Sequence, residues 1–133
     1  MNLIKIIFLL PIIAIFYKDS IKKMNNLYGY YLIVSDFRIS TSKVMISIFT
    51  SIFISIDLAI ALGLLVSTTR NISCILGIIL ELFYLIIMLK NYDKGFENGC
   101  NCYIINTTNK EIRLIDILKI IGVIFVFICI LII

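Results

Sequence analysis

Two of the four cysteines of this chain, Cys100 and Cys102, are one residue apart in the polar stretch ENGCNCYII. A disulfide between residues i and i+2 closes a small ring, so it is expected to be strained and easily reduced. Such a bond suits thiol–disulfide exchange with a partner better than it suits a structural brace. The spacing alone leaves two alternatives open, which are a metal site and a pair of loop cysteines without a role.

A metal site has weak support from the residues around the pair. Zinc in proteins usually takes about four ligands. The stretch supplies two thiols, the chain contains no His, and only Asp93 and Glu97 could add oxygen ligands nearby. We therefore predict no metal here.

The composition predicts an integral membrane protein. The chain has 133 residues, of which 62% are hydrophobic, and its mean hydropathy is +1.13. Its length is enough for one domain of about four helical spans at ~20 residues each. The net charge is +4, and most of the basic residues lie in connecting segments, where they can meet lipid headgroups. This pattern gives no indication of nucleic-acid binding.

Four apolar runs predict the fold, an all-α membrane four-helix bundle in a single domain over residues 1–133. The predicted spans are residues 3–17, 44–66, 72–89 and 114–133. The first run resembles a signal peptide, but no small-x-small cleavage site follows it, so we predict that it is retained. The longest polar stretch, residues 90–113, joins the third and fourth spans and carries the cysteine pair.

A segment with a different pattern follows the first span. Its apolar residues recur at helical spacing, with Lys22, Lys23, Asn25 and Asn26 between them; they are Ile21, Met24, Leu27, Tyr28 and Tyr31. This pattern, over residues 21–34, predicts a short amphipathic helix at the membrane interface, or an extension of the first helix out of the membrane.

Two carboxyl groups lie inside the predicted spans. Asp57 is nine positions before Val66, and Glu81 is nine positions after Ile72. The turn STTRN joins these two helices, so we expect both carboxyls at similar depth near the middle of the membrane. Acidic groups there normally face the bundle interior, and at least one should be protonated and hydrogen-bonded. They could form a proton relay or a polar contact for a quinone headgroup, or simply an interhelical hydrogen bond.

Other small side chains in the spans are expected to be structural. Cys74 and Cys129 should be buried as small hydrophobic groups, on the membrane side opposite the cysteine loop. One face of the second span predicts close helix packing through its hydroxyl residues, Ser47, Thr50, Ser51 and Ser55.

Three segments together resemble the MauE-type branch of the DoxX-like membrane proteins. They are FYKDSIKKMNNLYGYYLI (16–33), SIDLAIALGLLV (55–66) and GCNCYI (99–104). The resemblance covers almost the whole chain, with three departures from the usual pattern. Asn101 stands for the central Gly of the cysteine motif, Tyr103 for a Phe, and Asp57 for a Glu.

The resemblance implies a membrane thiol–disulfide oxidoreductase, or an accessory factor, that supports disulfide formation in exported proteins. Cys100 and Cys102 would be its redox centre and a thioredoxin-like protein its partner. By analogy with quinone-linked disulfide generators of four-helix design, a membrane quinone would take the electrons. The competing interpretation is a non-enzymatic membrane protein, such as an immunity factor or a transporter accessory subunit.

Charge and family pattern disagree on orientation. Four spans place the cysteine loop on the side opposite the N-terminus and the STTRN turn. That opposite side carries most of the basic residues, namely Lys18, Lys22, Lys23, Arg38, Lys43, Lys90, Lys94, Lys110 and Arg113. Charge alone therefore places the loop in the cytoplasm, where a disulfide is usually kept reduced. We predict a multi-pass bacterial membrane protein with this loop on the outer face, because the implied role operates there.

Overall fold

The computed structural model describes residues 3–36, 41–90 and 114–133, and this part of the chain is helical throughout, apart from its turns and ends. The helices are α1 (Leu3–Asn25), α2 (Leu27–Asp36), α3 (Lys43–Leu65), α4 (Arg70–Lys90) and α5 (Leu114–Ile132). The prediction of an all-α chain is confirmed for these residues. Cys100 and Cys102 lie outside the described residues.

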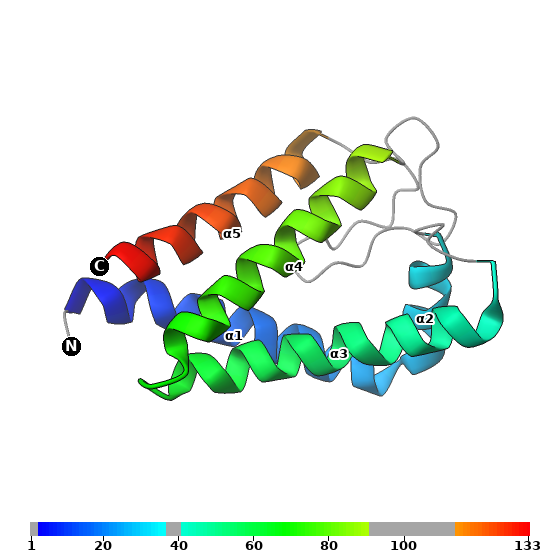
Figure 1. Cartoon of the computed structure of the whole chain (residues 1–133), viewed down its shortest axis with the longest axis horizontal. Coiled ribbons are helices and arrows are strands. Elements are labelled where there is room, and N and C mark those ends of the chain that lie inside the picture. The colour runs from blue at the N-terminus through cyan, green and yellow to red at the C-terminus, as the bar shows by residue number, and fades with distance from the viewer. Residues whose placement is uncertain (1–2, 37–40, 91–113) are drawn as a thin grey trace.

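The helices pack in two antiparallel pairs. α1 lies along α3, and α4 lies along α5, while the short turn at residues 66–69 joins α3 to α4 (Figure 1). α2 continues beyond α1 and packs on α3, and a smaller contact joins α1 to α5. The arrangement brings the N- and C-terminal ends of the described chain close together (Figure 1). A bundle of four membrane spans remains a prediction.

Two of the described helices, α3 and α4, are long and apolar enough to cross a membrane. The apolar stretch of α5 is shorter, Ile117–Ile132. Large apolar side chains are exposed on every helix. Examples are Ile7 (59% exposed), Tyr28 (73%), Ile79 (59%) and Phe125 (65%). Soluble proteins rarely leave so much apolar surface uncovered, whereas a lipid environment favours it.

The first helix is longer than the span predicted at residues 3–17, since α1 continues to Asn25. The predicted short helix after it is present as α2, but the polar residues between the apolar ones do not all face outward. Lys23 is 5% exposed, whereas Met24 and Leu27 are 50% and 57% exposed. The buried stripe of α1 explains this, because it continues at steps of three and four residues from core to polar side chains, through Leu9, Ile12, Phe16, Asp19, Ser20 and Lys23.

Hydrogen bonds from side chains end α3 and shape its turn into α4. The hydroxyl of Thr69 donates to the carbonyl oxygen of Gly63 at 2.9 Å, and Nε of Arg70 donates to that of Leu64 at 3.1 Å. These bonds satisfy carbonyls that the end of a helix leaves without partners. Arg70 is therefore a buried capping residue rather than a fully solvated charge.

The hydroxyl face predicted for close packing on α3 is mostly exposed. Thr50 is buried, but Ser47, Ser51 and Ser55 are not, so the prediction is wrong for these three serines. The hydroxyls of Thr50, Ser51 and Ser55 donate instead to the backbone carbonyls four residues earlier, at 2.8, 3.2 and 2.8 Å. Such local bonds satisfy a hydroxyl without a neighbouring helix.

Phe127 of α5 is the centre of the contact among three helices. Its side chain is fully buried, and its ring lies 5.6 Å from the ring of Phe16 in α1, centroid to centroid. On α4, a Cβ added at Gly77 would lie 2.5 Å from the tip of the Phe127 ring. The absence of a side chain at Gly77 thus lets α4 and α5 approach each other closely.

We expect Gly77→Ala to destabilise the protein, because the added methyl group would displace a buried ring that Phe16 confines. The free energy of unfolding should fall by about 1–3 kcal/mol, as for other overpacked cores. The matched control is Gly122→Ala on α5, where an added Cβ meets nothing within 4 Å. Reversible denaturant unfolding in detergent micelles measures both, and equal stabilities of the two variants would refute this packing argument.

Candidate functional site

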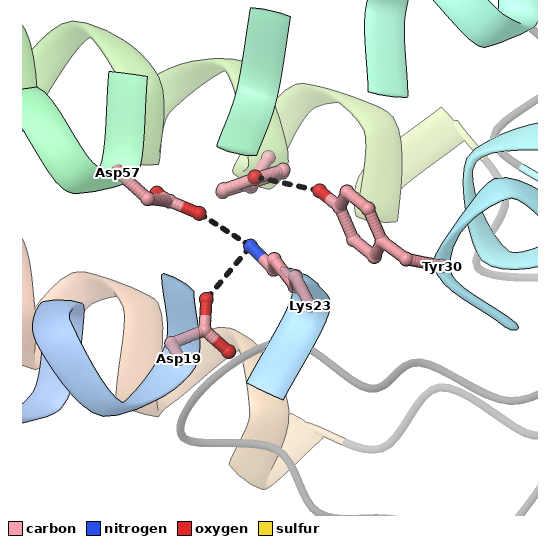
Figure 2. Close-up of polar contacts among 5 residues, drawn as sticks. Asp19, Lys23, Tyr30 and Asp57 are labelled. Carbon is pink, nitrogen blue, oxygen red and sulfur yellow. Dashed lines mark hydrogen bonds and ion pairs between the residues drawn. The ribbon is translucent and has the colours of Figure 1, made fainter. Parts of the chain in front are cut away.

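A lysine ammonium lies between two carboxyl groups in the core of the described helices. Nζ of Lys23 is 2.5 Å from Oδ2 of Asp57 and 2.7 Å from Oδ2 of Asp19. Asp19, Lys23 and Asp57 are 3%, 5% and 0% exposed. Figure 2 shows the lysine nitrogen joined to both acids, and we call these three residues the charge cluster.

Helix geometry explains how the charge cluster is assembled. Asp19 and Lys23 are four residues apart on α1, so their side chains lie one above the other on the same face. That face is the buried stripe of α1, which packs along α3 and thereby meets Asp57. The Lys23–Asp57 pair joins residues 34 positions apart in the chain.

Two tyrosines face the lysine from other helices. Nζ of Lys23 is 4.6 Å from the ring centroid of Tyr30 on α2 and 5.8 Å from that of Tyr84 on α4. The hydroxyls of these two tyrosines are 3.3 Å apart, and either can donate to the other. An aromatic face attracts a cation, most strongly where water is excluded. The ammonium is thus held by two carboxyl groups and two aromatic rings, contributed by four helices.

The two carboxyls are not satisfied to the same degree. Lys23 donates an aligned hydrogen bond to Oδ2 of Asp57, whereas its contact with Oδ2 of Asp19 has ion-pair distance without hydrogen-bond alignment. Oδ1 of Asp57 and Oδ2 of Asp19 are buried without a hydrogen-bond partner among the described residues. Buried polar atoms usually have partners, so these two atoms mark an incompletely satisfied polar centre.

Glu81 adds a third buried carboxyl, from α4. Its side chain is fully buried, and it lies three residues before Tyr84 on the same helical face. The structure thus buries both acids that the sequence analysis selected. Asp57 pairs with Lys23, a partner that the sequence analysis did not predict. The roles of Asp57 and Glu81 as a proton relay or a quinone contact remain predictions.

The two described cysteines are on α4 and α5, whereas the charge cluster is built from α1 and α3. Cys74 near the start of α4 is fully buried, and Cys129 near the end of α5 is half-buried; both are free thiols. Their predicted role as small hydrophobic groups fits this burial. Within residues 3–36, 41–90 and 114–133, no group of three or more His, Cys, Asp or Glu side chains could hold a metal.

Two signals in the sequence could have revealed Lys23. Extending the helical spacing of Leu9, Ile12 and Phe16 by further turns leads to Asp19, Ser20 and Lys23. An acid in an apolar span also calls for a nearby cation. Local apolar spacing alone groups Lys23 with its polar neighbours, so this pattern does not reveal the pairing with Asp57.

Comparison with protein families shows to which family this chain is related. The family model described as methylamine utilisation protein MauE matches residues 1–133. The chain belongs to the MauE family. The resemblance noted in the sequence is thereby confirmed, and family membership together with the apolar helices α3 and α4 identifies a membrane protein. Searches of curated proteins and of solved structures find no match.

In this MauE-family protein, we expect Lys23→Met to cause a large loss of stability. The variant leaves two buried carboxyls facing each other without their cation, and breaking a buried ion pair typically costs about 3–5 kcal/mol. Lys18→Met makes the same chemical change at an exposed position of α1 and should shift stability by less than about 0.5 kcal/mol. Chemical unfolding in micelles compares the two. If Lys23→Met were as stable as Lys18→Met, the ion pairs would contribute nothing to the fold.

Proposed function

We propose that this protein is a membrane thiol–disulfide oxidoreductase, or an accessory factor to one, acting through Cys100 and Cys102. The observation that carries the proposal is the Cys-x-Cys pair in a polar stretch of a chain that the MauE family model matches from end to end. Its partner would be a thioredoxin-like protein, and its substrates would be exported proteins that acquire disulfides. A four-span bundle would hold the pair at the membrane surface.

The proposed reaction is a disulfide exchange that balances within the two proteins. A thiolate of the partner attacks one sulfur of the Cys100–Cys102 disulfide, and the other sulfur leaves as a thiolate. The second thiol of the partner then attacks the mixed disulfide and releases the reduced pair. The partner is oxidised by two electrons, and Cys100 and Cys102 accept those electrons together with two protons.

Turnover requires an acceptor that reoxidises the reduced pair. We propose a membrane quinone, which would take two electrons and two protons and become a quinol. Asp57 and Glu81 are the buried carboxyls proposed to contact such a headgroup or to pass protons. The groups proposed to take part in the chemistry are the thiols of Cys100 and Cys102 and the carboxyls of Asp57 and Glu81. No proposed step uses a metal.

A second candidate function has an observation in its favour. The charge cluster pairs α1 with α3 through groups that are unrelated to the cysteines. Such a cluster would serve equally well in a non-enzymatic membrane protein, for example an immunity factor or a transporter accessory subunit. There the helix faces would contact the partner, and the cysteines would be incidental.

Replacing both loop cysteines separates the two functions. We expect Cys100→Ser with Cys102→Ser to abolish oxidation of the thioredoxin-like partner, because neither exchange step can occur without both sulfurs. Cys74→Ala with Cys129→Ala should retain that oxidation, since these thiols are distant from the loop in sequence and packed in the helices. The redox state of the partner, measured by thiol alkylation, is the readout. Full partner oxidation in the serine variant would favour the second function.

The side of the membrane is testable through the same cysteines. In cells that carry the Cys74→Ala and Cys129→Ala changes, we expect a membrane-impermeant maleimide to label Cys100 and Cys102 after mild reduction. The role requires an oxidising compartment, which lies outside the cytoplasm. Labelling only after permeabilisation would place the loop inside, as the distribution of basic residues favours.

A further inference from the structure

We infer that the charge cluster of Asp19, Lys23 and Asp57 is a binding site for one exchangeable proton, held between the helices. This site is separate from the cysteine pair and does not depend on the proposed redox function. Three observations support it: the balance of buried charges, the incomplete satisfaction of the carboxyl oxygens, and the chemistry of the surrounding helices.

The charge balance is the first observation. Two carboxylates and one ammonium carry a net charge of −1 when all three are ionised, and each residue is at most 5% exposed. An uncompensated charge is strongly disfavoured away from water. One added proton makes the cluster neutral, as a carboxylic acid and a carboxylate that share one ammonium. A second proton would give the cluster a net charge of +1. The charge balance therefore favours one bound proton.

The carboxyl oxygens supply the second, independent observation. A carboxylate offers about four acceptor positions, yet Asp57 receives one aligned hydrogen bond at Oδ2, from Lys23, and Oδ1 has no partner among the described residues. Oδ2 of Asp19 also lacks a hydrogen-bond partner there. A neutral carboxylic acid needs fewer donors around it than a carboxylate does. The surroundings of the two carboxyls therefore suit one carboxylic acid and one carboxylate better than two carboxylates.

Among the described residues, no second cation contacts Asp57. From α2, Tyr30 presents its ring to Lys23, and from α4, Tyr84 does the same at longer range. α4 also contributes Glu81, which is a further buried acid rather than a base. α5 does not pack against α3, which carries Asp57. Lys23 is thus the one cation in contact with Asp57 among the described residues (Figure 2).

Substitutions in the charge cluster should change the number of protons that it holds by whole numbers. The number of protons held equals the number of cluster carboxyls minus the number of ammonium groups. Asp19→Asn and Asp57→Asn each leave a neutral acid–lysine pair, so each should hold none. Lys23→Met leaves two acids without a cation and should hold two. Lys18→Met, on the exposed side of α1, should hold one, as the unsubstituted protein does.

Infrared spectroscopy can count these protons. The full chain is made by cell-free synthesis with 13C-aspartate, placed in lipid vesicles at neutral pH, and the C=O stretch of protonated carboxyls is recorded against unlabelled protein. A labelled band is expected in the unsubstituted protein. It should be lost in Asp19→Asn and in Asp57→Asn, and it should double in Lys23→Met.

Asparagine is close in shape to aspartate, and in both asparagine variants the remaining carboxylate forms a charge-neutral pair with Lys23. These two variants therefore test the inference even if Lys23→Met does not fold. A missing labelled band in the unsubstituted protein would overturn the inference, as would an undiminished band in both asparagine variants. The variant with Cys100→Ser and Cys102→Ser should retain the band in full. Failure of the redox proposal and failure of the proton site are therefore distinguishable.

Discussion

The ion pairs of Lys23 are the constraint on which the described structure depends. An ammonium group cannot be left alone among apolar side chains, so the helices must bring carboxylates to it. Asp19 comes from the same helix, one turn away, but Asp57 comes from α3. The pairing therefore fixes where α1 lies along α3. It also accounts for the place of α2, whose Tyr30 covers the lysine from the side opposite the acids.

The same constraint reverses the usual arrangement of an amphipathic segment. In α1 and α2, the charged side chain of Lys23 is inside, while apolar residues such as Met24 and Leu27 are outside. This arrangement is stable only where the outer surface meets other apolar material, as in a lipid bilayer. Membership of the MauE family and the two apolar helices α3 and α4 agree with such an environment. The hydrophobic residues of this chain therefore form much of its outer surface as well as its core.

Hydropathy alone predicts the later helices well. The runs at 44–66, 72–89 and 114–133 correspond to α3, α4 and α5 within one or two residues at each end. α3 and α4 begin and end where the chain changes from apolar to polar, which is a local signal. The end of α1 was missed because its charged residues resembled the edge of a span. Their burial depends on Asp57, 34 positions beyond Lys23, and no local pattern contains that information.

The candidate site was predictable to the same extent. Burial of Asp57 and Glu81 follows from their place in apolar runs, and the structure shows both at 0% exposure. What could not be read locally was which charge neutralises them. In the resemblance noted from the sequence, Asp57 stands for a Glu. Asp keeps the negative charge but is shorter by one methylene group, so the long stem of Lys23 must span the gap between α1 and α3. What the packing of α1 on α3 needs at this position is a polar group that the Lys23 ammonium can reach.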